Sequence, residues 1–442
     1  GKYFLSIIFN RILKPKSKAG IDDWLKETYL DWFWNIHTSS QKLWNHLCYL
    51  DDDAIDTIGN KIADKTFEIV NDDQYLWDTS NYFTYINNRK SDLLAKGKSK
   101  QGRHDKNLIS HGVLVSKESR IPVWHTQYKY KHDSKILNEK INEISQFLKR
   151  YRKKDFTLVM DKGNNSKDNI KLLSKYSFIG SLRAEQTRKL FKIPLKEYEC
   201  EYKNRKENCV SVHDAGIHKL YESEYRIIIS YEEASYKKQK KTFEKSLEET
   251  LKKYEGIKDK KYDKNMTAMN ALKKILPRKR LKAFNKNVLK KDKKWIVELS
   301  KNESEIKTYK QSFGKTAVFT NKKGDAIEII KSYRSLNIVE DQFKALHNSF
   351  MIPITPTYEW TDQKIKAHVF LCFIALVLVR VLEFEARAMQ INKTYSRLLE
   401  ETGNIRMGLV LDGKKAEYCF EQMTVEQQEL MNLFGLHEFA KF

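Results

Sequence analysis

Three carboxylates in this sequence stand where residues of their type could hold a divalent metal ion. Asp78 follows the apolar run LW, Asp161 follows LVM, and Glu340 lies in the helical pattern YRSLNIVEDQFKAL. We expect the first two at strand ends and the third on a helix. Mg²⁺ prefers oxygen ligands, and phosphodiester chemistry uses several carboxylates around one or two such ions. If the fold brings the three acids together, the sequence predicts a Mg²⁺ site, with Mn²⁺ as a substitute metal.

Each acid also has an ordinary structural explanation. Asp78 can begin an Asx turn before Thr79, and Asp161 can begin a turn before Gly163. A single acid such as Glu340 is most often exposed on a helix surface. The catalytic interpretation therefore depends on the three residues acting together with their ordered flanking sequences.

Positive charge is concentrated in one part of the chain. The 442 residues include 82 Lys and Arg but only 58 Asp and Glu, which gives a net charge of +24. Residues 237–294 alone hold 22 Lys and Arg against 7 Asp and Glu, more than half of the surplus. The bias of an AT-rich genome would be spread evenly, whereas a localised excess is typical of a surface that neutralises phosphates. Nucleic acid or another acidic surface is therefore the expected partner, and together with the three carboxylates the charge indicates double-stranded DNA.

The end of this basic stretch, PRKRLKAFNKNVLKKDKK, has apolar residues at helical spacing from Leu281 to Leu289. Its cations would lie on the opposite face, so we expect a helix that follows the phosphate backbone. A solvated helix face is the alternative. The candidate DNA contacts in this stretch are Arg278, Lys279 and Arg280.

Several other chemistries are excluded by the absence of their motifs. The five cysteines form no CxxC pair, so neither a zinc site nor a disulfide framework is expected. The GKS at Gly97–Ser99 lacks the preceding glycine of a phosphate-binding loop, and there is no GxGxxG, GxSxG or HExxH motif. The longest apolar run, Val369–Val379, is shorter than the ~20 residues of a membrane span. We expect a core helix there, in a cytoplasmic, nucleoid-associated protein without a membrane partner.

The hydrophobic pattern predicts a helical opening followed by a mixed α/β region. Strands are expected in QYLWD, LISHGVLVS, IPVWHTQYKY, FTLVMD and SFIGSLRA. Three strands in a meander, followed by helix, strand, helix and strand, are typical of an RNase H-like domain, in which helices flank a mixed five-stranded sheet. The helices are predicted over roughly 3–13, 21–36, 38–50, 52–70, 134–151 and 166–175, with caps near Ser39 and Asp51.

Residues 186–325 interrupt this unit with the basic stretch and with strands in EYRIIISYEEASY, KWIVELS and KTAVFTN. A long helix is then expected from near Asp325 through Glu340, followed by the nearly all-apolar helix KIKAHVFLCFIALVLVRVLEFEARAM, which would back the sheet. One face of the long helix would carry Tyr333, Leu336, Glu340, Lys344 and His347. The predicted domains are a helical, DNA-binding region 1–70, catalytic-core parts 71–185 and 326–400, the inserted basic α+β subdomain 186–325, and a tail 401–442 with dimer or DNA contacts.

Six stretches, in the same order, resemble the DDE transposases of bacterial and archaeal insertion sequences. They lie between about residues 75 and 390: WDTSNYFTY, GKSKQGRHDKNL, IPVWHTQYKYKHD, LVMDKGNNSKDNIKLL, AVFTNKKGDAIEIIKSY, and YRSLNIVEDQF with the following IPITPTYEWTDQKIKAHVFLCFIALVLVRVLE. The resemblance is to the group with a β-rich insertion between the second Asp and the Glu. It implies that Asp78, Asp161 and Glu340 are the catalytic and metal-binding residues.

That group has a Tyr-x2-Arg-x3-Glu-x6-Lys pattern around its third acid. Tyr333 and Glu340 are in step with it, whereas Leu336 replaces the Arg and His347 replaces the Lys, which resembles a phosphate contact in relatives. Arg334 and Lys344 are nearby cations that could substitute. Further candidate DNA contacts are Lys98, Lys100 and Arg103 in GKSKQGR, for which a solvated hairpin tip is the alternative, and Trp295, which could stack on a displaced base or pack in the core.

The resemblance implies a cut-and-paste DNA transposase that acts as a homodimer on paired ends. It would bind terminal inverted repeats, cut them with water, and join the 3′-hydroxyl to target DNA, using two Mg²⁺ ions about 4 Å apart. Two alternatives stay open. One is a catalytically inactive, transposase-derived DNA-binding protein, and the other is a metal-dependent nuclease that acts on RNA or branched DNA.

Overall fold

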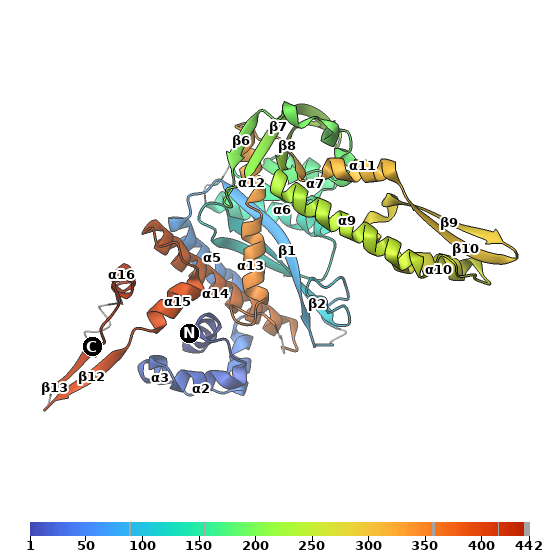
Figure 1. The fold of residues 1–442 in the computed structure, drawn as a ribbon. Coiled ribbons are helices and arrows are strands. Elements are labelled where there is room, and N and C mark those ends of the chain that lie inside the picture. The colour runs from blue at the N-terminus through green and yellow to red at the C-terminus, as the bar shows by residue number, and fades with distance from the viewer. Residues whose placement is uncertain (88–89, 152, 154, 356–358, 414, 437–442) are drawn as a thin grey trace. The chain divides into compact units, whose positions relative to one another are not determined.

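The computed structural model covers residues 1–442 and describes residues 1–87, 90–151, 153, 155–355, 359–413 and 415–436. The chain folds into two compact units (Figure 1). The first unit consists of Gly1–Ser177 with Arg334–Phe442, and the second of Phe178–Tyr333. The predicted insertion lies within the second unit, and the predicted domain boundaries stay predictions.

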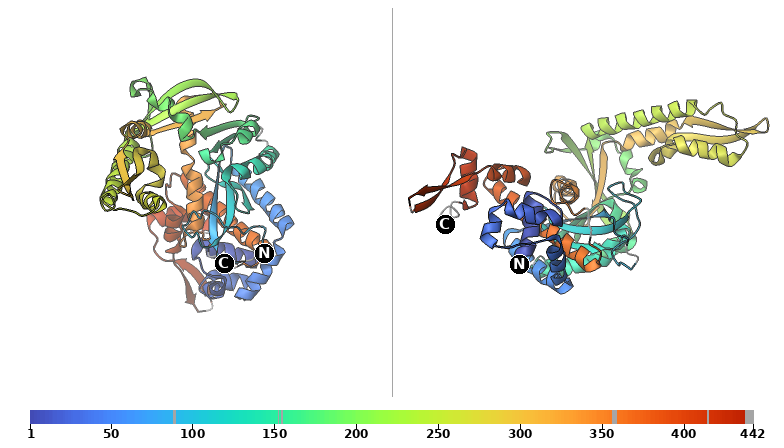
Figure 2. Two further views of the ribbon diagram at one scale, coloured as in Figure 1. Left: turned by 90° about the vertical axis from the view of Figure 1, so that its right-hand side faces the viewer. Right: turned by 90° about the horizontal axis from the view of Figure 1, so that it is seen from below.

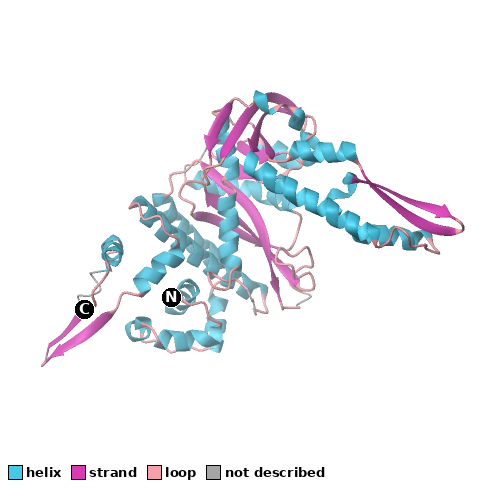
Figure 3. Cartoon of the chain, in the orientation of Figure 1, coloured by secondary structure: helices cyan, strands magenta, loops and turns pink. Residues whose placement is uncertain are grey.

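Residues 1–70 form helices and no strand (Figure 3). The side chains of Ser39 and Asp51 each accept a hydrogen bond from a helix amide, so both predicted caps are present. The single helix predicted over 21–36 is wrong, because the extended backbone of Thr28 separates two short helices. The elements are α1 Lys2–Leu13, η1 Lys18–Gly20, α2 Ile21–Lys26, α3 Tyr29–Trp34, α4 Ser40–His46, η2 Leu47–Tyr49 and α5 Asp52–Ile69.

The first unit contains a mixed sheet with the strand order β3-β2-β1-β4. Strand β2 is antiparallel to both β1 and β3, whereas β4 is parallel to β1. This is the RNase H-like arrangement that the sequence predicts for the first four of five strands. The elements are β1 Gln74–Thr84, β2 Asn107–Ser116, β3 Pro122–Tyr128, α6 Asp133–Arg150, β4 Thr157–Met160, η3 Lys162–Asn164 and α7 Lys167–Leu173.

Two later helices complete the core of the first unit. Helix α13, Asn337–His347, packs against β1 and β2, and α14, Asp362–Ala388, packs against β3 and α1. By length and composition alone α14 could cross a membrane, but 72% of its most apolar segment is buried inside the protein, as in a core helix. The remaining elements are α15 Tyr395–Gly403, the paired strands β12 Met407–Asp412 and β13 Lys415–Phe420, and α16 Val425–Leu433.

The second unit has a sheet with the order β5-β11-β8-β7-β6 and a separate two-stranded hairpin, β9–β10. The hairpin packs against α10, and Figure 2 shows it at the opposite end of α9 from β8. The predicted strands at KWIVELS and KTAVFTN are confirmed, and so is the one at EYRIIISYEEASY, except that its last four residues begin α9. The elements are β5 Ser177–Ser181, α8 Ala184–Thr187, η4 Leu190–Lys192, η5 Leu195–Glu197, β6 Cys200–Lys203, β7 Cys209–Leu220, β8 Ser223–Glu232, α9 Glu233–Glu255, α10 Asn265–Ile275, η6 Arg278–Ala283, β9 Phe284–Lys291, β10 Lys294–Lys301, α11 Glu303–Ser312, β11 Lys315–Thr320 and α12 Ala326–Arg334.

The amphipathic helix predicted within 277–294 is wrong, because this stretch folds as the short 3-10 helix η6, Arg278–Ala283, followed by strand β9, Phe284–Lys291. Asp292 and Lys293 both have positive φ angles, of 51° and 65°. Two successive residues of this kind make the tight turn whose twist suits a hairpin. Cross-strand pairs such as Val288 with Val297 then decide the structure. Pairing with β10 therefore overrides the helical spacing of the apolar residues.

The single long helix predicted from Asp325 through Glu340 is also wrong. It is interrupted at Ser335 and Leu336, where the Ile338 amide donates to the Ser335 carbonyl 2.8 Å away, a tighter turn than that of an α-helix. Tyr333 consequently lies on α12 and Glu340 on α13. The predicted common face is divided between two helices.

Candidate active site

The register of the sheet places Asp78 and Asp161 side by side. Strands β1 and β4 are parallel, and their last paired residues are Trp77 and Met160. Asp78 and Asp161 come next on the two segments, and Asp161 keeps an extended backbone. Neighbouring strands lie about 4.8 Å apart and opposite residues point to the same face, so the two carboxylates share one face of the sheet.

The two acids occupy different positions along their strands. Asp161 directly follows the end of β4, as predicted, but Asp78 lies inside β1, which continues to Thr84. The strand is longer than its apolar signal because residues beyond Asp78 pair with β2. Asp78 therefore still pairs with β2, at the point where the neighbouring strand β4 has ended.

The electrostatics of the pair favour a bound cation. Burial raises the pKa of Asp78 to about 6, and the negative charges of Asp133 and Asp161 add to this effect. Lys100 and the Thr79 amide, which donates to Asp78 Oδ1 over 2.8 Å, act in the opposite direction on the same pKa. A carboxylate removed from solvent beside other carboxylates is stabilised by a divalent ion. The oxygen donors of Asp78 and Asp161 thus fit Mg²⁺ or Mn²⁺.

Lys100 is the cation with the largest electrostatic effect on Asp78. Its ammonium group donates a hydrogen bond to the Thr79 carbonyl. The buried Asn81 holds the Lys100 backbone, because its Oδ1 accepts from the Lys100 amide at 2.9 Å and its Nδ2 donates to the Lys98 carbonyl at 3.1 Å. The loop around Lys100 is therefore docked on β1 rather than free as a hairpin tip.

The two other predicted cations of this loop have different surroundings. Lys98 is exposed. Arg103 lies over the Phe83 ring, 5.2 Å from its centroid, and its Nε is 3.4 Å from an oxygen of Asp105. Arg103 is therefore already engaged in local contacts.

Glu340 does not join the acid pair. It is exposed on α13, whose buried residues include Val339 and Phe343, although the helix itself packs against β1. Within the described ranges, no group of three or more His, Cys, Asp or Glu side chains is placed to hold a metal ion.

His347 cannot supply the charge of the lysine that it replaces in the signature. Burial, together with the nearby charge of Lys100, lowers the pKa of His347 to about 4. The imidazole is therefore neutral at neutral pH. Lys100, not His347, provides positive charge at this place.

The other predicted DNA contacts are distributed over both units. Tyr333 and Arg334 are half-buried, and Lys344 is exposed with its ammonium 2.7 Å from Asp341. In the second unit, Arg280 donates to the Thr242 carbonyl at 2.9 Å. Through this hydrogen bond Arg280 links η6 to α9, which is a structural role.

Trp295 packs against the hydrophobic core of the insertion, which contains Phe243, Leu272 and Val297. The ammonium of Lys290 lies 6.0 Å from the centre of its ring. Packing is thus the observed environment of Trp295. The predicted contacts Arg278 and Lys279 have side chains outside the described part of the structure.

Two residues that the sequence did not single out lie at the acid pair. The Thr79 hydroxyl donates to Asp133 Oδ1 over 2.8 Å, and the charge of Asp133 reaches Asp78. The only sequence signal for Asp133 was an acid in the first turn of a helix, which usually interacts with the helix dipole. The place of Asp133 at the acid pair depends on its contact with Thr79, which is 54 residues away in the sequence.

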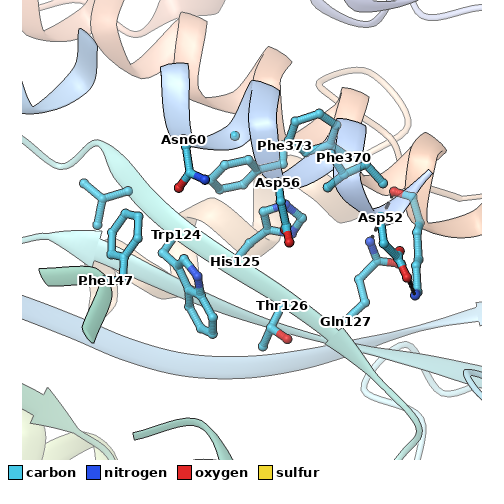
Figure 4. A pocket seen from close by; sticks show the side chains of 14 residues that line it. Asp52, Asp56, Asn60, Trp124, His125, Thr126, Gln127, Phe147, Phe370 and Phe373 are labelled. Carbon is cyan, nitrogen blue, oxygen red and sulfur yellow. Dashed lines mark hydrogen bonds and ion pairs between the residues drawn. The ribbon is translucent and has the colours of Figure 1, made fainter. Parts of the chain in front are cut away.

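One cavity of the first unit lies away from the acid pair. It has a volume of about 360 Å³ and is lined by α5, β3 and α14 (Figure 4). Aromatic rings of Trp124, Phe370 and Phe373 surround His125, and Asp52 at the rim is paired with Lys366 at 2.8 Å. None of the three predicted acids lines this cavity. The acid pair is therefore not part of this cavity.

Comparison with known proteins gives similarity to solved structures only. No family profile matches the sequence, and no curated protein matches it. A piggyBac transposase synaptic complex with hairpin DNA is similar over 90% of this chain and 68% of that chain, with 9% identity and a TM-score of 0.43. A Mos1 transposase paired-end complex with the left transposon end is similar over 40% and 56%, with 11% identity and a TM-score of 0.19. Both solved structures are transposases, but such low values do not transfer a function.

Proposed function

We propose that this protein is a DNA transposase of the DDE type, from a prokaryotic insertion sequence. The observation that supports this most is the register of the parallel strands β1 and β4 in an RNase H-like sheet, which puts Asp78 and Asp161 side by side directly after the paired residues Trp77 and Met160. Two adjacent carboxylates on one face of a sheet are suited to a divalent cation and through it to a phosphate. The surplus of 24 positive charges supports DNA as the substrate.

Asp78 and Asp161 would hold Mg²⁺ or Mn²⁺, and Glu340 would complete a site for two ions. When bound, such ions activate an attacking oxygen and stabilise a leaving one in phosphodiester cleavage. Glu340 would have to turn from solvent toward β1, on which α13 already packs.

Lys100 would contact the phosphate that is cut. Its loop is fixed to β1 by Asn81, and its ammonium lies at the Thr79 carbonyl, next to Asp78. A lysine so held adds positive charge where negative charge develops in the reaction. The neutral His347 would leave this role to Lys100.

The exposed cations of the second unit would bind the DNA backbone without reading sequence. Lys282, Lys286 and Lys291 are exposed on η6 and β9. Phosphate contacts of this kind give affinity that depends on salt. Terminal inverted repeats and target DNA would be the substrates, and a homodimer would hold the paired ends.

A second candidate function is a transposase-derived protein that binds DNA without cutting it. The observation in its favour is that Glu340 is exposed and that no three acidic or histidine side chains in the described segments form a metal site. This candidate keeps the basic surface and makes no use of the acid pair.

The deciding experiment is Mg²⁺-dependent cleavage of a labelled duplex that carries the inverted repeat flanking the element. The wild type and Glu340→Gln are compared at equal DNA occupancy. We expect the wild type to cut in the presence of the metal and to leave a 3′-hydroxyl at the repeat end, and the variant to bind without cutting. Repeat binding with no metal-dependent cutting by either protein would contradict the proposal and favour the second candidate.

A further inference from the structure

Asp133, the first residue of α6, lies between the segments that carry the two acids. Its Oδ1 accepts the hydrogen bond from the Thr79 hydroxyl, one residue after Asp78. Its Oδ2 is 3.2 Å from the position that a Cβ on Gly163 would occupy, two residues after Asp161. One carboxylate therefore touches both segments, and a side chain at Gly163 would crowd it.

The next residues of α6 fix the turn that follows Asp161. The Ser134 carbonyl accepts a hydrogen bond of 2.7 Å from the amide group of Asn169, which also donates to the Asn164 carbonyl at 2.7 Å. Asn138, on the next turn of α6, donates to Asn169 Oδ1 at 3.1 Å. Asn169 is fully buried. The turn after Asp161 is thus attached to the same helix end that holds Thr79.

The position of Asp133 near Asp78 is electrostatically unfavourable in the absence of a bound cation. Asp133 brings a third negative charge toward Asp78. An asparagine could accept the same hydrogen bond from Thr79 without that repulsion. A bound cation removes the repulsion, and groups that orient metal ligands are commonly needed for full metal affinity.

We propose that Asp133 is a positioning residue that sets the spacing of Asp78 and Asp161 for a divalent cation. It acts through its hydrogen bond to Thr79 and its contact with Gly163, and it is not itself a ligand. This inference rests on the proposed function, in which the acid pair holds the cation.

The test measures Mn²⁺ binding to the full-length protein without DNA, by calorimetry and electron paramagnetic resonance. Asp133→Ala should weaken binding by about 10-fold or more, as is typical for groups that orient ligands. Asp133→Asn, which keeps the acceptor, should lose less. Asp168→Ala is the matched control, because Asp168 is an exposed first-turn acid of α7 close to the same site.

Thr79 provides an independent variant if Asp133→Ala does not fold. Thr79→Val removes the hydroxyl at constant shape and should weaken Mn²⁺ binding, whereas Thr79→Ser should restore it. The Asp133→Ala, Thr79→Val double variant should be no weaker than the worse single one, because both remove the same hydrogen bond.

Folded Asp133→Ala and Thr79→Val proteins that bind Mn²⁺ with the wild-type affinity would overturn this inference alone. The reference is the Asp78→Asn, Asp161→Asn double variant. If that variant also binds as the wild type does, the acid pair is not the cation site, and the proposed function is contradicted together with the inference.

Discussion

Around Asp78 and Asp161 the polar side chains are held by buried hydrogen bonds, whereas the cations of the β9–β10 hairpin stand in solvent. Asn81 and Asn169 are almost completely buried. Lys286 and Lys291 are exposed on a strand of the two-stranded hairpin. Fixed groups suit chemistry that needs a set distance between ligands. Exposed cations suit the DNA phosphate backbone, which a protein can bind at many positions along the duplex.

The largest expected effect is at the acid pair. Asp78→Asn or Asp161→Asn should reduce Mg²⁺-dependent DNA cleavage by about 10³-fold or more, because a bound metal ion supplies several kcal/mol of transition-state stabilisation. DNA affinity in the absence of metal should not fall, since a negative charge is removed. Single-turnover cleavage and a filter-binding titration on the same preparations measure both quantities. Equal losses of binding and cleavage would mean that the acids are structural.

The second-largest expected effect concerns Lys100, whose ammonium is hydrogen-bonded to β1, in comparison with Lys98 of the same loop. Lys100→Ala should slow cleavage by about 10- to 100-fold at saturating DNA, because it removes one positive group beside the reacting phosphate. Lys98→Ala, two residues away in the same loop, is the matched control and should change the rate little. Single-turnover rates at several Mg²⁺ concentrations provide the measurement. Similar rates for the two variants would remove Lys100 from the site.

Substitutions in the basic insertion should lower DNA affinity without changing the rate of cleavage. Replacing Lys282, Lys286 and Lys291 by Gln should weaken DNA binding by about 10-fold and should reduce the salt dependence of affinity by up to ~3 in the log–log slope. The cleavage rate at saturating DNA should be unchanged. A control variant replaces Lys65, Lys140 and Lys331, each of which forms an ion pair with a nearby Glu. An equal loss in the control would show that net charge alone matters.

The smallest effect concerns the metal-free protein and pH. The pKa of Asp78 rises from 3.8 to about 6 on folding, so the folded state keeps a proton that the unfolded state releases. Stability should therefore fall as pH rises from about 4 to about 6 and stay reduced above it. Asp78→Asn avoids this loss and should be more stable than the wild type at pH 8, by roughly 1–2 kcal/mol, but not below pH 4.

Thermal unfolding with and without Mn²⁺ checks this expectation. The metal should stabilise the wild type and leave Asp78→Asn nearly unchanged, because a ligand stabilises only the state that binds it. A wild type that is more stable than the variant at pH 8 without metal would contradict the electrostatic description of the pair.

Local sequence signals predicted most elements of the first unit. The apolar runs before Asp78 and Asp161 indicated β1 and β4, and Ser39 and Asp51 marked two helix starts through hydrogen bonds within one turn. These features depend on residues close in sequence. Signals for structure that depends on distant residues are weaker. The apolar residues near β9 are spaced as in a helix, so the sequence predicts a helix there. Only pairing with β10 makes the segment a strand.

The acid pair was predictable to the extent that both acids directly follow apolar runs in the sequence. Two acids after apolar runs fall side by side because β1 and β4 are parallel neighbours. Lys100 was a candidate from the sequence, but its place beside the acids depends on Asn81, and that of Asp133 depends on Thr79. Spacing along the chain indicates neither place. The break between α12 and α13 lies at Ser335 and Leu336, where the Ser335 carbonyl accepts a hydrogen bond from the Ile338 amide, and the sequence has no Gly or Pro there to mark it.

The most direct test of the central claim is to locate Mn²⁺ by anomalous scattering in crystals of the protein bound to its inverted-repeat DNA. We expect a peak bridging the carboxylates of Asp78 and Asp161 at roughly 2.1 Å, the ligand distance of small divalent ions, with Glu340 turned toward it. A DNA complex in which Mn²⁺ is absent from the acid pair, or is bound only at other acidic residues, would contradict the account.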